Sequence, residues 1–330
     1  MTNFILKKSF NLDRFNYYLE SAIQSNQFTN YGAAVQQLEQ RAKTNLRIDD
    51  SKAVIATSSG SSALNAIVYA ISRHDSINYR VSTQDFTFPC NSQGAAEGAI
   101  IADLDNSLQC NVLDDMVQNY SNMVIITNCF GHLQNLTYIQ EHTTNLDKKL
   151  ILDNAATPFS FWKGTNSCNI GNASFISLHH TKPIGFGEGG LVVIDKEYEQ
   201  AVRTAINFGI IDNAFNERGG NFKMSELAAA GVLQWWDSFD NNMEQLALDF
   251  TDRHYRARYE HRNLEGIVFT HHADEEDIFF PNCLPFIHEN VTSIDNYKEY
   301  DARKYYHPLR GLSNSTYVYD RITCMGIVDE

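Results

Sequence analysis

The chain lacks the features that mark membrane, secreted and nucleic-acid-binding proteins. Its 330 residues contain no run of about 18 apolar residues, so we expect no membrane span. The first residues also lack the long apolar core of a signal peptide. Only 26 Lys and Arg stand against 40 Asp and Glu, without a basic cluster, and the net charge is −14. Such a chain repels phosphate backbones and anionic surfaces, so we expect neither nucleic acid nor a membrane as partner.

No pair of cysteines is arranged as CxxC. The six cysteines are scattered along the chain, at Cys90, Cys110, Cys129, Cys168, Cys283 and Cys324. In a chain of this length such spacing indicates reduced thiols and not a disulfide framework. The sequence therefore predicts a cytoplasmic protein.

Motifs for metal binding and serine hydrolysis are missing as well. There is no HExxH or HxH, and the pairs His179-His180 and His271-His272 would point to opposite faces of a strand. We therefore expect no metal site. The acidic run 274–277 is typical of a solvated loop. No GxSxG elbow is present for a nucleophilic serine.

The chain does have enough apolar residues for a core, at 43% hydrophobic and 12% aromatic. Over the first 240 residues or so, short apolar runs alternate with helical patterns. The runs at 53–56, 123–126, 150–152, 175–178 and 191–194 predict buried strands, and helices are predicted over 64–71 and from Met224 to Trp236. This alternation predicts an α/β fold with a mostly parallel sheet covered by helices on both faces. After Asp240 the composition changes, so we predict a large domain at 1–240 and a small C-terminal α+β domain at 241–330.

Three segments carry candidate chemistry, and the first is the Ser/Gly-rich turn 57–62 between a strand and a helix. Free N–H groups and the helix dipole at such a turn form an anion site. Gly60 would permit close approach of a ligand, and Ser61 and Ser62 add hydroxyl donors. An ordinary capped helix explains the same residues.

The second segment is Asp153, at the end of an apolar strand. In open α/β sheets ligands bind beyond the carboxyl ends of the strands, so this aspartate is a candidate site residue. Capping of a following helix is the alternative.

The third segment, 177–190, carries Lys182 on a glycine-rich turn. Gly185, Gly187 and Gly190 match GxGxxG, but a strand follows where the dinucleotide motif requires a helix. What remains is a lone lysine between two buried strands. Partial desolvation lowers the pKa of such an amine, as a Schiff-base lysine requires.

Together, a helix-start anion site, a strand-end carboxylate and a turn lysine are what pyridoxal 5'-phosphate requires. Its phosphate needs N–H donors, its ring nitrogen needs a carboxylate and its aldehyde needs an amine.

In this combination the chain resembles the DegT/DnrJ/StrS-type nucleotide-sugar aminotransferases, which have the fold type I architecture. The resemblance runs from about Asn11 to residue 237, and more weakly to the end. The segments that carry it are 28–32 with 38–39, 57–64, 86–88, 129–132, 152–156, 177–190 and 220–227.

The resemblance implies roles for individual residues. Lys182 would form the Schiff base, Asp153 would pair with the pyridinium nitrogen, and Phe88 would stack on the ring. Ser177 would bind the phosphate, and Asn221 would reach the phosphate of a neighbouring subunit. A homodimer with shared sites follows, with the segment 1–50 contributing to the dimer and to the site.

The resemblance also implies the reaction. L-glutamate would donate an amino group to a nucleotide-linked 4-keto-6-deoxysugar, at C4 in preference to C3, for glycan biosynthesis. Tyr31 and His179 are the candidates for substrate contact, although His179 could equally be a packed, hydrogen-bonded side chain. The aromatic stretch near Tyr305 and Tyr306 either contacts substrate or packs the small domain.

Three departures from the family pattern stand out. Ala156 replaces a usual Gln or His near the ring oxygen, where Thr157 offers a substitute contact. Lys223 replaces the usual Arg, and the region after Arg321 is shorter than expected. Two alternatives therefore remain open: a pyridoxamine-dependent sugar dehydratase, against which Lys182 argues, and a non-catalytic protein that binds cofactor or sugar nucleotide.

Overall fold

A seven-stranded sheet forms the centre of the molecule in the computed structural model, which describes residues 2–105, 121–212, 214, 218–269 and 278–329. The strand order is β2-β10-β9-β6-β5-β3-β4. Six strands run parallel, and β10 is antiparallel to both of its neighbours. The strands are β2 (Lys52–Thr57), β3 (Val81–Gln84), β4 (Ile100–Ala102), β5 (Met123–Thr127), β6 (Lys149–Asp153), β9 (Ala173–Ser177) and β10 (Gly190–Asp195). The predicted mostly parallel sheet is confirmed.

All five predicted apolar runs are strands of this sheet, whereas β3 and β4 were missed. β3 is buried along its length but carries Ser82, Thr83 and Gln84. Ser82 Oγ donates to Ser121 Oγ at 2.9 Å, and Gln84 Nε2 donates to the Phe86 carbonyl at 2.8 Å. Hydrogen bonds therefore allow a strand without an apolar run to occupy the interior.

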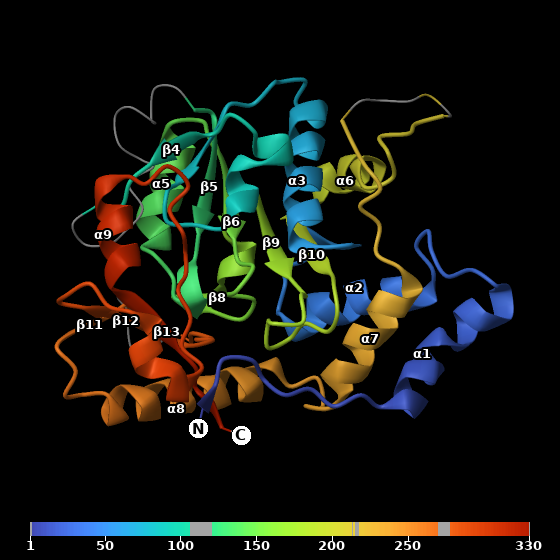
Figure 1. Cartoon of the computed structure of the whole chain (residues 1–330). Coiled ribbons are helices and arrows are strands. Elements are labelled where there is room, and N and C mark those ends of the chain that lie inside the picture. Colours follow the sequence, from blue (N-terminus) through green and yellow to red (C-terminus); the bar gives the residue numbers. More distant parts are fainter. Residues whose placement is uncertain (1, 106–120, 213, 215–217, 270–277, 330) are drawn as a thin grey trace.

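Helices cover both faces of the sheet (Figure 1). On one face, Ile55, Ile125 and Val192 pack against α3 (Gly60–His74) and α6 (Glu199–Ala205). On the other face, Val54 and Leu191 pack against α2 (Ala33–Asn45) and α7 (Glu226–Asp237), and α1 (Leu12–Ser25) joins the same core. On this second face, α5 (Leu136–Asn145) covers β5 and β6. Because successive side chains point to opposite faces, two covered faces require the continuous apolar runs seen in the sequence.

The helix predicted from Met224 begins two residues later, at Glu226. Ser225 is its N-cap, and the Ser225 side chain accepts a hydrogen bond from the Ala228 amide. The cap therefore decides where this helix starts.

The region after residue 240 contains a small antiparallel sheet of order β11-β12-β13. Its elements are α8 (Met243–Glu260), β11 (Gly266–Val268), β12 (Leu284–His288), α9 (Ser313–Arg321) and β13 (Ile322–Met325). A hairpin of β7 (Phe161–Trp162) and β8 (Thr165–Asn166) lies in the larger part. β1 (Thr2–Asn3) pairs with β14 (Val328–Asp329), so the two ends of the described chain lie side by side (Figure 1). The boundary at residue 240 stays a prediction.

Two aspartates fasten α9 to the main sheet. Asp85, fully buried after β3, accepts backbone N–H groups of Arg310 at 2.6 Å and Leu312 at 2.7 Å. Asp103, after β4, accepts the N–H group of Ser315 at 2.8 Å and also that of Asn314. Carboxylates at a helix N-terminus are favoured by its unpaired N–H groups and dipole. These contacts hold the chain before α9 over the carboxyl edge of the sheet.

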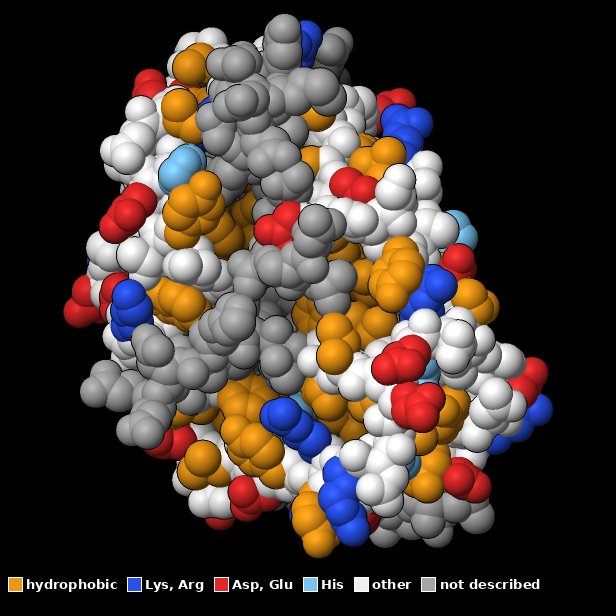
Figure 2. Space-filling model, turned by 90° about the vertical axis from the view of Figure 1, so that its left-hand side faces the viewer, with side chains coloured by type: hydrophobic (Ala, Val, Ile, Leu, Met, Phe, Trp, Pro, Cys, Tyr) orange, Lys and Arg blue, Asp and Glu red, His pale blue; other side chains and the backbone are white. Residues whose placement is uncertain are grey.

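No helix among the described residues is long and apolar enough to cross a membrane. On the face drawn in Figure 2, acidic and basic side chains are interspersed among hydrophobic ones. The five cysteines within the described ranges are free. Cys110, the pair His271-His272 and the acidic run 274–277 lie outside the described residues.

Replacing Gly131 with alanine should destabilise the protein strongly. Gly131 has a φ of +90°, and a Cβ there would overlap the carbonyl group of Phe280. We expect Gly131→Ala to lower the free energy of unfolding by more than about 2 kcal/mol, measured by urea denaturation.

Gly164→Ala is the matched control, because Gly164 has a φ of +76° but open space around the position of a Cβ. It isolates the backbone strain, of order 1 kcal/mol. Equal losses in both variants would contradict a steric role for the Phe280 contact.

Candidate active site

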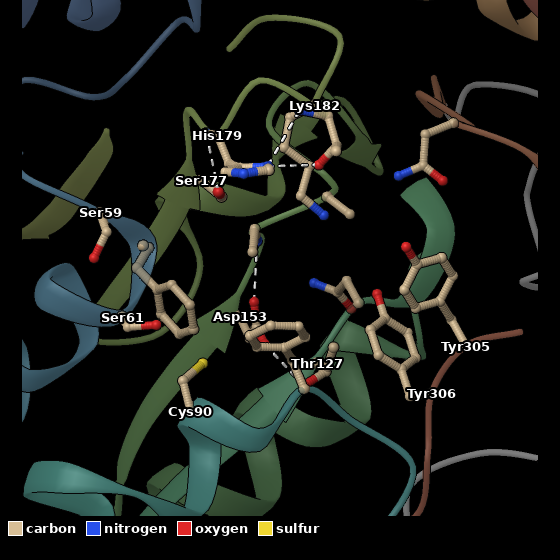
Figure 3. A pocket seen from close by; sticks show the side chains of 18 of the residues that line it. Ser59, Ser61, Cys90, Thr127, Asp153, Ser177, His179, Lys182, Tyr305 and Tyr306 are labelled. Carbon is tan, nitrogen blue, oxygen red and sulfur yellow. Dashed lines mark hydrogen bonds between the residues drawn. The ribbon is translucent and has the colours of Figure 1, made fainter. Parts of the chain in front are cut away.

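A cavity of about 350 Å³ lies at the carboxyl edge of the main sheet. Its walls come from the segments that follow β2, β3, β5, β6 and β9, and from the chain before α9 (Figure 3). Seven of the residues singled out from the sequence line it, namely Gly60, Ser61, Phe88, Asp153, Ser177, His179 and Lys182. Because parallel strands end at one edge, residues as far apart in sequence as Gly60 and Lys182 meet here.

The start of α3 forms one wall of this cavity. Ser59 is the N-cap, and its Oγ accepts the Ser62 amide at 3.1 Å. The amides of Gly60 and Ser61 donate to no acceptor within the described residues. A Cβ on Gly60 would lie 3.3 Å from the Ser177 Cβ, so glycine permits the helix start and β9 to approach closely. The capped helix is therefore observed, and its free amides border the cavity.

Asp153 is the buried carboxylate at the end of β6, with 2% exposure. Its Oδ2 accepts Asn91 Nδ2 at 3.0 Å and Thr127 Oγ1 at 3.1 Å, and its Oδ1 accepts the Ala155 amide at 3.0 Å. Burial raises the pKa of Asp153, while these three donors and the nearby Lys182 act in the opposite direction. A cationic group in the cavity would further favour the charged form.

Asn91 and Thr127 were not predicted as site residues. Thr127 is the residue of β5 that pairs with Asp153 in the sheet register. Asn91 follows Phe88 within a short 3₁₀ helix, η1 (Pro89–Ser92). The apolar run before Thr127 predicts strand β5 but not which strand lies beside it. The contact between Thr127 and Asp153 is therefore revealed only by the pairing of β5 with β6.

Lys182 lies in the turn between β9 and β10 and lines the cavity. The turn is closed by hydrogen bonds from the Lys182 amide to the His179 carbonyl at 2.8 Å and from the His180 amide to the Gly187 carbonyl at 2.7 Å. Burial lowers the pKa of Lys182, and the charge of Asp153 opposes this shift. A larger share of the amine is therefore neutral and nucleophilic near pH 7 than in an exposed lysine.

His179 meets both of its predicted descriptions, because it lines the cavity and is also hydrogen-bonded. Its Nδ1 accepts the Thr181 amide at 3.2 Å and lies 2.9 Å from Thr181 Oγ1. That contact places the ring hydrogen on Nε2, which faces Glu188 Oε1 at 3.5 Å. The ring is thus held beside Lys182 in one orientation.

The wall opposite the serines is aromatic and polar. Tyr305 and Tyr306 stand across the cavity from Ser59 and Ser61 (Figure 3). Phe4, Phe130 and Asn282 complete this wall. The aromatic stretch near Tyr305 was noted in the sequence, whereas Phe4 and Asn282 carried no recognisable motif. The pairing of β1 with β14 and a contact between the rings of Phe4 and Tyr305, whose centres are 5.7 Å apart, place Phe4 here.

Three predicted residues do not line this cavity: Tyr31, Ser62 and Asn221. Ser62 Oγ is engaged by Ser58 Oγ at 2.9 Å and Ser59 Oγ at 3.0 Å. Tyr31 borders a second cavity of about 280 Å³, where its hydroxyl donates to Glu39 Oε2 at 3.0 Å. Asn221 is exposed. Within one chain these residues are separate from Lys182.

Thr157 cannot supply the substitute contact suggested for Ala156. Ala156 lines the cavity, but Thr157 is fully buried, and its Oγ1 donates to the Asn128 carbonyl at 2.7 Å. The hydroxyl is therefore already committed to the protein interior. Asn128 is a polar residue that does line the cavity.

The family of the chain is established by its sequence. Residues 12–281 match the DegT/DnrJ/EryC1/StrS aminotransferase family, and the chain belongs to that family. One relative is the dTDP-4-amino-4,6-dideoxy-D-glucose transaminase of Shigella dysenteriae, 28% identical over 233 residues. The match covers 68% of this chain and 61% of the length of that relative.

Solved structures share the fold. DesI, crystallised in the presence of its TDP-sugar product, superimposes with a TM-score of 0.80 at 19% identity, covering 98% of this chain and 87% of that one. 3-Amino-5-hydroxybenzoic acid synthase gives 0.82 at 14% identity, covering 99% and 94%. The fold type I architecture of pyridoxal-phosphate-dependent aminotransferases is thus confirmed. At these identities the likeness establishes the fold and not the substrate.

Removing the amide donor of Asn91 should make Asp153 harder to ionise. Asn91→Leu deletes one of the hydrogen bonds that stabilise the carboxylate, so the pKa of Asp153 rises further. The carboxylate is then charged over a narrower pH range, because on acidification it becomes protonated at a higher pH than in the wild type. Titration of carboxyl-labelled protein by ¹³C NMR measures the change.

Ser92→Ala serves as the control, since Ser92 is in the same 3₁₀ helix but donates to the Pro89 carbonyl. An Asp153 titration midpoint unchanged in Asn91→Leu would show that the Asn91 contact does not hold the carboxylate.

Proposed function

We propose that the protein is a pyridoxal-phosphate-dependent aminotransferase. It moves an amino group from L-glutamate to the C4 keto group of a nucleotide-linked 4-keto-6-deoxysugar, for glycan biosynthesis. The observation that carries the proposal is the convergence of an uncapped pair of helix amides, a buried carboxylate and a buried lysine on one cavity. Membership in an aminotransferase family supports the same reaction class.

The residues present fit the cofactor. The amides of Gly60 and Ser61, with the Ser177 hydroxyl, would hold its phosphate, and a Cβ on Gly60 would make a tight contact of 3.3 Å with the Ser177 Cβ. Asp153 would hold the ring nitrogen, and Lys182 Nζ would hold the aldehyde carbon. Phe88, half exposed at the cavity, would stack on the ring.

Pyridoxal phosphate, when bound, supplies an electron sink that stabilises negative charge on the α-carbon of the donor. Lys182 Nζ, with its lowered pKa, takes the proton from that carbon as a general base and later returns a proton as a general acid. The Asp153 carboxylate keeps the ring nitrogen protonated. The three donors to Asp153 hold its carboxylate in one orientation at the cavity.

A nucleotide-linked sugar is the proposed acceptor. A named dTDP-sugar transaminase among the relatives supports it, and the amino group in the name of that relative stands at C4. The polar atoms of Asn282, Tyr305 and Tyr306 are suited to a sugar, and the ring of His179 is placed beside Lys182. The preference for C4 over C3 is part of the proposal.

The proposed active form is a homodimer with shared sites. Asn221 and Tyr31 do not reach Lys182 within one chain, so their predicted roles require a second copy. Exposed apolar side chains surround this part of the surface, among them Phe208 at 43% and Leu227 at 51% exposure. Lys223 Nζ lies over the Phe208 ring at 4.7 Å and donates to Asn207 at 2.7 Å. An exposed apolar area of this kind favours an interface. The cytoplasmic location stays a prediction that rests on the cysteine spacing.

Lys182→Ala should abolish transamination. Loss of the amine removes both the covalent attachment and the general base, so we expect the turnover with L-glutamate and a keto sugar nucleotide to fall at least about a thousandfold. The absorption band of covalently attached pyridoxal phosphate should also disappear. Absorbance spectra before and after glutamate, with product analysis, measure both effects.

Lys196→Ala is the control, because Lys196 is exposed and follows β10 outside the cavity. The same spectra separate the alternatives. A wild-type protein that binds the cofactor but forms no 2-oxoglutarate from glutamate would favour the dehydratase. A folded protein that gives no cofactor band would leave only the non-catalytic alternative.

Complementation between two impaired variants should reveal shared sites. We expect Asn221→Ala to be weakly active and Lys182→Ala to be inactive. Co-expressed in equal amounts, they form hybrid dimers with one intact site, so about one quarter of the wild-type activity should return. Activity assays on the purified mixture provide the measurement.

Lys182→Ala mixed with Asp153→Ala is the matched control. Both residues lie in the cavity of one chain, so no hybrid has an intact site and activity should not return. Full activity of Asn221→Ala alone would refute the shared site and leave the assignment of Lys182 untouched.

A further inference from the structure

Residues 2–11, here called the N-terminal strap, run from the β1–β14 pair to the start of α1. It begins in β1 beside β14, and the Phe4 amide donates to Asp301 Oδ2 at 2.9 Å. It ends where the Asn11 amide donates to Gln234 Oε1 of α7 at 2.9 Å. Figure 1 shows this segment running from the N-terminus, past the lower edge of the fold, to α1. The strap is therefore fastened at both ends.

Lys8 of the strap lies against the turn that carries Lys182. Its Nζ donates to the backbone carbonyls of His180, Lys182 and Gly185, the second at 2.7 Å. A lysine ammonium has three N–H donors and no acceptor, so the three carbonyls match it in number. Lys8 is the only side-chain donor to these carbonyls within the described residues.

Two tryptophans of α7 donate to the two carbonyls that lie between Lys182 and Gly185 in the chain. Trp235 Nε1 donates to the Pro183 carbonyl at 2.9 Å, and Trp236 Nε1 donates to the Ile184 carbonyl at 2.7 Å. Lys8 Nζ also lies 5.7 Å from the centre of the Trp235 ring. Side chains of the strap and of α7 thus satisfy the carbonyls of residue 180 and of residues 182–185. The Lys182 carbonyl also accepts the Gly185 amide at 3.0 Å, whereas the carbonyls of the buried residues Pro183, Ile184 and Gly185 are paired by these side chains.

We propose that Lys8 is a positioning residue, whose ammonium holds the turn so that Lys182 Nζ points into the cavity. The role of Lys182 rests on the proposed function, but the contact of Lys8 with the turn does not. Lys8 does not line the cavity, and it acts only through the backbone of residues 180–185.

The burial of Lys8 supports a specific role. Burial lowers its pKa to about 7, so a charged amine in this place is costly unless its protons are accepted. The three carbonyls accept them. A methionine would fill the same space without this cost, and it could not bind the turn.

The test compares Lys8→Met with Lys7→Met. Lys7 is the adjacent lysine and is exposed, so its variant controls for the loss of one charge from the strap. Hydrogen exchange of cofactor-free protein is measured at the turn amides that are bonded in the structure, Leu178, His180, Lys182 and Gly185. We expect exchange at these amides to be at least about tenfold faster in Lys8→Met, with β5 and β6 unchanged.

The second readout is kinetic and spectroscopic. A misplaced Lys182 should lower kcat about 10- to 100-fold, with little change in the KM for glutamate. It should also shift the pH midpoint of the absorption band of attached pyridoxal phosphate. A purely structural role for Lys8 would lower stability without moving that midpoint.

Lys8→Ala with added propylammonium, which replaces the deleted atoms, keeps the test decisive if Lys8→Met folds poorly. Restored protection of the turn amides would support the proposal. Wild-type exchange in Lys8→Met, or a uniform increase over the whole chain, would overturn it. Locally faster exchange in a protein that is inactive with every amino donor would support the contact of Lys8 with the turn and refute the proposed function instead.

Discussion

The site depends on keeping an aspartate charged in the interior of the protein. Asp153 is 2% exposed, and burial raises its pKa, which disfavours the charged form. Three donors from three segments, together with the charge of Lys182, oppose that tendency. All of them reach Asp153 because β3, β5, β6 and β9 run parallel and end at one edge. The direction of the strands and the ionisation of one carboxylate are therefore linked.

Burial and the neighbouring charge also act on the pKa of Lys182, but each in the opposite direction to its effect on Asp153. Burial favours its neutral amine, while Asp153 favours the ammonium, so each group limits the shift of the other. The turn that carries Lys182 has no regular secondary structure, and its carbonyls are bonded by Lys8, Trp235 and Trp236. The backbone of this turn is thus bonded by donors far away in sequence.

Much of this architecture could be predicted from the sequence, since apolar runs and helical periodicity follow directly from burial on two faces. Strand β3 escaped prediction because Ser82, Thr83 and Gln84 are buried polar residues that give no apolar run, and the side chains of Ser82 and Gln84 are satisfied by hydrogen bonds. The start of α7 differed because the Ser225 cap decides it. In the site, Gly60, Asp153 and Lys182 were predictable as strand-end or turn residues, and Ser177 through the family resemblance. Phe4, Asn91 and Asn282 were not, because no local pattern sets their neighbours.

The sequence by itself determined the class of fold and the residue types available for chemistry, because both follow from local periodicity and from short motifs. Only the tertiary structure decided which of these residues meet. It joined Phe4 to the cavity through a strand pair at the chain ends, and it committed the Thr157 hydroxyl to a buried carbonyl. It also separated Tyr31 and Asn221 from Lys182 within one chain. The reason is physical: hydrogen bonds and packing between distant segments depend on strand order and register, which no local stretch of sequence encodes.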